Sequence, residues 1–165
     1  IYVYGEERHS RRVAKEIVRR RLEAPFETTL ELAEAVRAVV PKSRDKIDPA
    51  TRTFQALRIA VNDELGELER ALEASVDILK PGGRLVVVTF HSLEDRIVKR
   101  FLKEKSGSVS SVSRHMPVIE DAKDVAVFEI KTRKAVCASD EELALNARSR
   151  SAKLRAAERL GGEVL

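Results

Sequence analysis

Apolar residues in the first half of the chain recur in steps of three and four, which predicts amphipathic helices. We expect the first helix from about Glu7 to Leu22. A second helix should begin at Thr28, because Thr28 and Glu31 have the spacing of a capping box, and it should end at Pro41. This part of the chain is therefore expected to be all-helical.

The longest periodic pattern opens with Asp48 and Pro49, which suit the N-cap and the first position of a helix. Its apolar stripe continues to Leu79 without a change of period. This predicts one helix of about 30 residues, roughly 45 Å long. Gly66 is the position at which such a helix would bend.

A different pattern starts after the turn Pro81-Gly82-Gly83. Residues 85–90 are a continuous apolar, mostly β-branched run, typical of a strand buried on both faces in a parallel sheet. Ser92 is then expected to cap a helix that carries Leu93 and Leu102 on its apolar face. A strand, a short loop and a helix form the repeating element of a doubly wound α/β domain.

The remaining residues predict shorter elements. A Ser-rich loop, Ser106–Ser113, separates the helix from a second strand at Val125–Arg133. Ser139, followed by acidic residues, is expected to start a short helix. Propensity alone predicts that the tail, Ser151–Leu160, is helical.

Composition places the chain among ordinary globular proteins of the cytoplasm. With 165 residues, 43% of them apolar, it can form one domain or parts of two. No apolar stretch approaches the roughly 20 residues of a membrane-spanning helix, so no membrane association is expected. The single cysteine excludes a disulfide framework within the chain. The chain begins at Ile1 with an apolar IYVYG, which indicates a fragment, a processed chain or the ordered part of a longer one.

The loop His91-Ser92 is the first candidate for chemistry, because α/β enzymes bind ligands beyond the carboxyl ends of their strands. An imidazole and a hydroxyl can both hydrogen-bond an amine. The alternative is structural: Ser92 caps the next helix and His91 closes the turn. Glu94 and Asp95 lie in the first helical turn, where acids favour the helix dipole whatever their function. No residues have the spacing of metal ligands, so no metal site is predicted.

Charge supplies the second candidate, a nucleic-acid interface. The net charge of +4 is modest, but cations concentrate near the N-terminus. At 100° per residue Arg8, Arg12, Lys15 and Arg19 fall on one line, called the basic stripe below. Polar residues on the long helix would also suit a phosphate backbone: Arg52, Gln55 and Arg58. The alternative is a solvated helix face. The low aromatic content, 4%, argues against a base-stacking platform.

Short motifs add a resemblance to a known family. Residues 79–90, LKPGGRLVVVTF, resemble the turn and fifth strand of class I, Rossmann-like methyltransferases. Further segments are similar to a bacterial family called MraW or RsmH. These are YGEER (Tyr4–Arg8), PATRTFQALRIAVNDEL (Pro49–Leu65), FHSLEDRIVKRF (Phe90–Phe101) and NARSRSAKLRAAER (Asn146–Arg159).

The resemblance implies an S-adenosylmethionine-dependent enzyme that methylates N4 of a cytidine in the decoding region of 16S ribosomal RNA. The expected partner is this RNA within the 30S subunit. The implied fold class is α/β: the C-terminal strands and helices of a class I Rossmann-like methyltransferase, with an inserted all-helical domain. Residues 4–74 would form the helical substrate-recognition domain, and residues 75–165, with 1–3, the C-terminal part of the methyltransferase domain.

The resemblance also changes two details. It makes Val125–Arg133 the sixth strand and Lys153–Arg159 an antiparallel seventh. For Lys153–Arg159 we follow the resemblance and not the helical propensity, because pairing with a sheet easily overrides the weak propensity of a C-terminal tail. It places the glycine-rich loop and the acidic ribose ligand N-terminal to Ile1, so no cofactor-binding residue is expected in this chain. His91 and Ser92 would line the active site as its catalytic wall.

Two further interpretations stay open. A non-catalytic helical RNA-binding or ribosome-assembly module would explain the same cations without a complete methyltransferase site. Exposed core surface would be covered by the missing half of the enzyme or by a homodimer partner.

Overall fold

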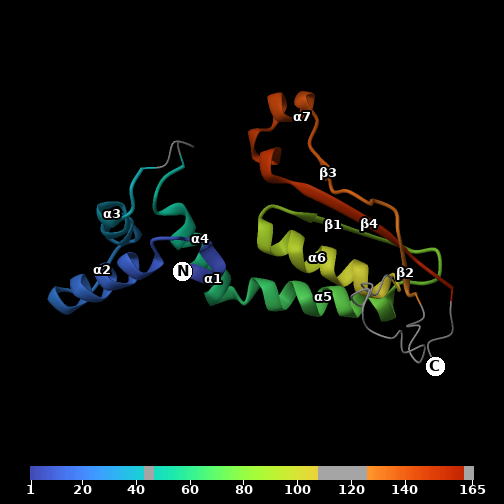
Figure 1. Cartoon of the computed structure of the whole chain (residues 1–165), viewed down its shortest axis with the longest axis horizontal. Coiled ribbons are helices and arrows are strands. Elements are labelled where there is room, and N and C mark those ends of the chain that lie inside the picture. The colour runs from blue at the N-terminus through green and yellow to red at the C-terminus, as the bar shows by residue number, and fades with distance from the viewer. Residues whose placement is uncertain (43–46, 108–125, 162–165) are drawn as a thin grey trace, which may run out of the picture. The chain divides into compact units, whose positions relative to one another are not determined.

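The computed structural model describes residues 1–42, 47–107 and 126–161 and consists of two compact units, Ile1–Glu64 and Leu65–Leu165 (Figure 1). Most of the Ser-rich loop and the first residue of the expected second strand lie outside the described residues. Along the sequence, the boundary between the units lies between Glu64 and Leu65, before residue 74, at which the sequence suggested a domain boundary. The domain assignment stays a prediction. Each unit is described by itself.

The first unit is helical, as predicted. Its helices are α1 (Tyr2–Gly5), α2 (Ser10–Glu23), α3 (Thr29–Val39) and α4 (Thr51–Asn62). The predicted cap at Thr28 is confirmed, since Thr28 Oγ1 accepts a hydrogen bond from the Glu31 N–H at 3.2 Å. The apolar faces of α2 and α3 meet in a small core with the residue that precedes α4: Val13, Ala33, Val36, Val40 and Ala50.

The single long helix predicted from Asp48 is wrong in two respects. The helix begins at Thr51, with Ala50 as its N-cap, while the Asp48 carboxylate accepts a hydrogen bond from the Ala50 N–H at 2.8 Å. The helix also breaks at Asp63, which has a left-handed φ of 49°, and α5 (Glu64–Ile78) follows. Aspartate tolerates this conformation better than most residues, so the break occurs there and not at Gly66.

Helices α1 and α4 approach closely at Gly5. A Cβ atom on Gly5 would lie 2.4 Å from the carbonyl oxygen of Arg52, a distance that real contacts do not show. The Gln55 amide donates a hydrogen bond to the Tyr4 carbonyl oxygen at 3.3 Å. Two segments that carry the family resemblance, Tyr4–Arg8 and Pro49–Leu65, therefore pack on each other.

The second unit combines helices with an antiparallel sheet. Along the chain it contains most of α5, β1 (Arg84–Thr89), α6 (Ser92–Lys105), β2 (Phe128–Ile130), β3 (Val136–Cys137), α7 (Asp140–Leu145), the 3-10 helix η1 (Ala147–Ser151) and β4 (Lys153–Arg159). The strand order is β1-β4-β2, and β3 also pairs with β4; every pairing is antiparallel. The long strand β4 therefore crosses the middle of the sheet (Figure 1).

The strand β4 settles the conflict over the tail. It confirms the antiparallel strand at Lys153–Arg159, and the helix predicted from propensity alone is wrong. Pairing on both edges, with β1 and with β2, satisfies more backbone groups than an isolated short helix would. The second strand is shorter than expected, and the cap of α7 at Ser139 is confirmed by the hydrogen bond from Glu142 N–H to Ser139 Oγ, 3.2 Å.

Helices α5 and α6 cover one face of the sheet. Their side chains pack with β2 and β4 around Leu72, Val98, Phe101, Leu102, Phe128 and Ala157. The rings of Phe101 and Phe128 lie 6.0 Å apart in a tilted arrangement. Among the described residues, no helix is long and apolar enough to cross a membrane.

The strand β1 is not buried on both faces, contrary to the prediction. Leu85 and Val87 pack on the helices, whereas Val86 is 54% exposed and Val88 is 48% exposed. In the part of the chain that the structure describes, β1 also lies at the edge of the sheet, with β4 as its one neighbour. One face of this apolar run is thus exposed in the described chain, where a strand of a parallel sheet would be covered.

Candidate active-site loop and nucleic-acid interface

The loop between β1 and α6 is closed by His91 and Glu94. His91, not Ser92, is the N-cap of α6: its Nδ1 accepts a hydrogen bond from the Glu94 N–H at 3.4 Å. The Glu94 carboxylate in turn accepts hydrogen bonds from the Phe90 N–H at 2.8 Å and the His91 N–H at 3.2 Å. This reciprocal pair is a capping box in which histidine replaces the usual serine or threonine. The prediction that Ser92 caps the helix is therefore wrong.

The two residues of the predicted active-site wall differ in exposure. The His91 side chain is only 12% exposed, whereas Ser92, the first helical residue, is exposed. Because Nδ1 accepts a hydrogen bond, the proton of a neutral His91 ring is assigned to Nε2. Nε2 lies 3.1 Å from Glu94 Oε1 but is not aligned for a hydrogen bond, and it is buried without a partner among the described residues. Nε2 is therefore enclosed beside the Glu94 carboxylate and is not open to solvent.

The first turn of α6 is also tied to the sheet. Arg155 on β4 donates from Nε to Asp95 Oδ1 at 2.7 Å and from Nη2 to Oδ2 at 3.2 Å. Lys153 Nζ lies 3.6 Å from the same carboxylate. The hydrogen bonds and charge of Arg155, with the charge of Lys153, hold the pKa of Asp95 below its usual value. Both acids that follow the loop, Glu94 and Asp95, are thus committed to structure.

The basic stripe is only partly available to a ligand. Arg19 makes ion pairs with Glu16 at 2.9 Å and with Glu23 at 2.7 Å, which raise the pKa of its guanidinium. The hydrogen bond from Arg19, with a further one from Arg20, lowers the pKa of Glu16 to about 2. Arg12 and Lys15 are exposed and form no ion pair with the described residues.

On α4, two of the three predicted RNA contacts are engaged within the protein. Arg58 is bound to Glu64 by hydrogen bonds of 2.7 and 3.1 Å, and Gln55 is bound to the Tyr4 carbonyl. Arg52 is exposed and forms no ion pair within the described chain. The ion pairs of Arg19 are predictable from sequence, because Glu16 and Glu23 lie three and four residues away on the same helix. The hydrogen bond from Gln55 to the Tyr4 carbonyl depends on the fold.

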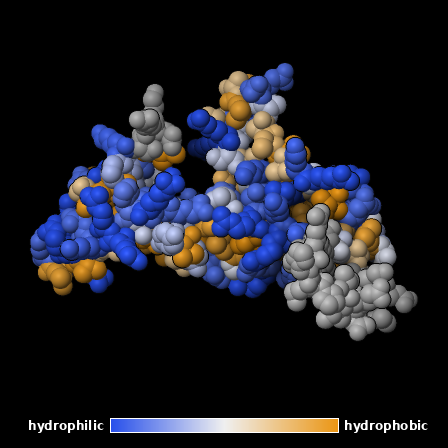
Figure 2. Space-filling view, in the orientation of Figure 1, coloured by the Kyte–Doolittle hydropathy of each residue, from blue (hydrophilic) through white to orange (hydrophobic). Residues whose placement is uncertain are grey.

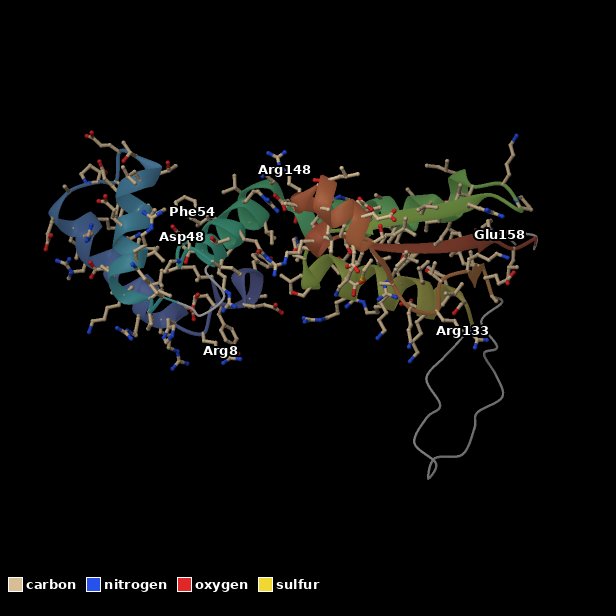
Figure 3. The ribbon with its side chains drawn as sticks, turned by 90° about the horizontal axis from the view of Figure 1, so that it is seen from above. Arg8, Asp48, Phe54, Arg133, Arg148 and Glu158 are labelled. Atoms are coloured by element: carbon tan, nitrogen blue, oxygen red, sulfur yellow. The ribbon has the colours of Figure 1, made fainter. Side chains whose placement is uncertain are left out.

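The fold brings Arg8 and Arg52 together at a cavity of about 270 Å³ in the first unit, called the basic cavity below. Two other residues in its wall, His9 and Lys42, were not predicted to belong to a binding site. The remaining lining residues are Glu7, Val40, Pro41, Ile47, Asp48 and Pro49. Figure 3 labels Arg8 and Asp48, which belong to the segments before α2 and before α4. The face of this unit seen in Figure 2 is predominantly hydrophilic.

At this level the structure defines a mixed α/β protein with a polar loop at the end of an edge strand and a cationic helical unit. Comparison with known proteins identifies the family: a family model described as the MraW methylase family matches residues 1–160. The chain therefore belongs to the MraW methylase family.

Curated relatives agree with this assignment. The chain is 63% identical over 159 residues to the protein named Ribosomal RNA small subunit methyltransferase H from Paramagnetospirillum magneticum, covering 96% of this chain and 50% of the relative. It is 58% identical over 165 residues to the protein of the same name from Caulobacter vibrioides, covering 99% of this chain and 53% of the relative. The chain thus spans about half the length of the curated relatives it matches.

Proposed function

We propose that the protein containing this chain is an S-adenosylmethionine-dependent methyltransferase that modifies N4 of a cytidine in the decoding region of 16S ribosomal RNA. This chain forms its C-terminal part. The observation that carries the proposal is the family match over residues 1–160, together with relatives whose names state methylation of small-subunit ribosomal RNA. The target atom and its place in the RNA follow from the family resemblance.

The proposal includes the architecture. The second unit supplies the C-terminal strands and helices of a class I Rossmann-like domain, and residues 4–74 form the inserted helical domain. The exposed edge of β1 supports this, because a long apolar edge strand is an aggregation hazard that proteins cover. A strand and helices from outside this chain would cover the edge and the exposed face that carries Val86 and Val88.

We place one wall of the substrate pocket at His91 and Ser92, whereas the residues around this loop do not fit the methyl donor. A donor site requires groups for the ribose and for the methionine carboxylate. Glu94 and Asp95, the acids that follow β1 in the sequence, are engaged with backbone amides and with Arg155. The loop after β1 contains no glycine that would let the backbone approach the cofactor closely. We assign the donor site to residues outside this chain.

The chemistry needs precise positioning of the base. The exocyclic amine of cytosine is a weak nucleophile because its lone pair is delocalised into the ring, so orientation and hydrogen bonding must supply much of the rate. The base must leave its stack to be reached. In the proposed arrangement His91 and Ser92 form the wall beside the amine. His91 fixes the loop through its cap, and Ser92 is the exposed residue of the pair.

The RNA backbone would contact the helical unit. Arg8, Arg12, Lys15 and Arg52 are the primary contacts, because they make no ion pair within the described residues. Arg19, Gln55 and Arg58 must leave intramolecular partners before they bind RNA, and we assign them a smaller share.

The direct test uses the full-length protein and 30S subunits that lack the modification. Labelled S-adenosylmethionine is added, the RNA is digested, and the nucleosides are identified by mass spectrometry. We expect label in N4-methylated cytidine. Label in another nucleoside would contradict the assigned target. Tight RNA binding without any transfer would favour the assembly module, and light scattering would show in the same preparation whether the protein is a homodimer.

A further inference from the structure

We propose that the basic cavity binds one backbone phosphate of the RNA substrate, with Arg8, Lys42 and Arg52 as its cationic ligands. The inference rests on the proposed function for the identity of the RNA. It goes beyond the basic stripe because it selects a pocket, adds Lys42, and assigns Arg58 and Arg19 no part in it.

Three cations from separate parts of the chain gather at the cavity. Arg8 precedes α2, Lys42 follows α3, and Arg52 lies in the first turn of α4. All are exposed residues in the wall of the cavity, and none forms an ion pair within the described part of the chain. Cations that have no acidic partner and share one cavity repel each other, and a bound anion relieves that repulsion.

The acids in the wall are already occupied. Asp48 accepts hydrogen bonds from Arg37, the shortest of 2.7 Å, and from the Ala50 N–H. These contacts lower the pKa of Asp48, so the carboxylate stays charged and bound to Arg37. Glu7 is only 3% exposed and accepts a hydrogen bond from the His9 N–H at 2.7 Å. Neither acid forms an ion pair with Arg8, Lys42 or Arg52 in the described structure.

The starts of two helices also lie at the cavity. The α2 N-cap, His9, lies in the cavity wall, and so do Pro49 and Arg52 on either side of the start of α4. Neither helix has an acidic residue in its first turn, and neither N-cap side chain bonds a backbone amide. The carboxylates of Glu7 and Asp48 bind the N–H groups of the N-cap residues themselves, His9 and Ala50. Helix N-termini carry partial positive charge and free N–H groups, which favour a phosphate.

The test compares two triple variants of the full-length protein. The cavity variant carries Arg8→Gln, Lys42→Gln and Arg52→Gln. The control carries Lys80→Gln, Lys99→Gln and Lys103→Gln, exposed cations of the second unit, and so has the same net charge. Affinity for a fragment of small-subunit ribosomal RNA is measured over a salt series, and thermal unfolding verifies that both variants fold. If the cavity triple does not fold, the single variants Lys42→Gln and Arg8→Gln replace it.

We expect the cavity variant to bind RNA roughly tenfold more weakly or worse, while the control changes little. One phosphate held by all the cations predicts that the slope of log affinity against log salt falls by about 0.7. Separate surface contacts would lower it by about 2, and that result would overturn the single-phosphate site. Equal losses in both variants, or no loss in the cavity variant, would overturn it as well.

Two further measurements distinguish the RNA phosphate site from a small-anion site and from the proposed methyl transfer. In the first, inorganic phosphate is titrated alone and thermal unfolding is followed. If phosphate stabilises the wild type but not the cavity variant, and both bind RNA equally well, the cavity is a small-anion site and the RNA assignment is refuted. Methyl transfer is scored separately. A full-length protein that binds RNA through the cavity but transfers no methyl group would refute the proposed function and leave the phosphate site standing.

Discussion

Arg155 and Asp95 form a bidentate ion pair across 60 residues of sequence, with side chains only 12% and 14% exposed. Asp95 lies one turn into α6, and Arg155 lies in β4 opposite Val87 of β1. The pair therefore joins the segments Phe90–Phe101 and Asn146–Arg159, which both carry the family resemblance. It fixes the start of α6, and with it the His91-Ser92 loop, to the middle of the sheet.

Replacing Arg155 with Gln should destabilise the full-length protein by about 1–3 kcal/mol, because a largely buried carboxylate loses its bidentate partner and keeps only the 3.6 Å contact with Lys153. Urea unfolding measures the change. Arg84→Gln is the matched control: Arg84 is 74% exposed, and its contact with Glu158 is 3.9 Å long, so the loss there should be near zero. Equal losses at the two sites would show that the geometry of the pair is unimportant.

The same pair predicts a pH dependence. Arg155 lowers the pKa of Asp95 below the ordinary value of 3.8 in the folded protein. The stabilisation is therefore complete above about pH 4 and is lost as the pH falls further, because protonation then favours the unfolded chain. The difference in unfolding free energy between the wild type and Asp95→Asn should shrink between pH 6 and pH 3. A difference that stays constant over this range would contradict the prediction.

The local elements of this fold were largely predictable from sequence, since caps and periodicity act over a few residues. Thr28 and Ser139 cap the helices expected of them. The break at Asp63 was not predictable, because the apolar period continues across it and one left-handed aspartate suffices to interrupt the helix. The partner of Asp95 was equally hidden, because no local pattern connects it with Arg155.

The candidate sites show the same division. The position of the candidate loop, His91-Ser92, followed from strand and helix patterns, but the identity of the cap did not, because histidine is an uncommon N-cap. The cations of the basic stripe were recognised, whereas the cavity that joins Lys42 to Arg8 and Arg52 exists only in the folded unit. The apolar run of β1 predicts that Val86 is buried, but in this chain alone its side chain is exposed.

Gly5→Ala tests the close approach of α1 and α4. Its new methyl group would lie 2.4 Å from the Arg52 carbonyl oxygen, and backbone cannot move aside as a flexible side chain does. We expect a loss of about 1–3 kcal/mol in stability. Gly161→Ala is the control, because its nearest neighbour, Pro81 Cβ, lies at an ordinary 3.9 Å. A neutral Gly5→Ala would show that the helices separate readily.

Substitutions of His91 distinguish a structural cap from a contact with the substrate. His91→Ala should cost about 1 kcal/mol, since the Glu94 N–H loses its acceptor, and His91→Asn should restore most of that stability. If His91 acts only as a cap, His91→Asn also restores methyl transfer. If Nε2 contacts the base, His91→Asn is stable but its kcat stays low. Stability is read from urea unfolding and kcat from label transfer to 30S subunits.

The exposed face of β1 gives opposite predictions for the chain alone and for the full-length protein. Val86 and Val88 are about half exposed in this chain, so Val86→Thr with Val88→Thr should leave its stability within about 0.5 kcal/mol and reduce its self-association. In the full-length protein the same changes would place hydroxyl groups under the covering layer and cost about 1–3 kcal/mol.

Val98→Thr is the control for this comparison. Val98 is fully buried in the chain as it stands, so its replacement should destabilise both proteins alike. Urea unfolding and light scattering on the two lengths measure the stability and the association. A double variant that is neutral in both lengths would mean that nothing covers this face of β1, and the proposal that residues outside this chain complete the sheet would fail.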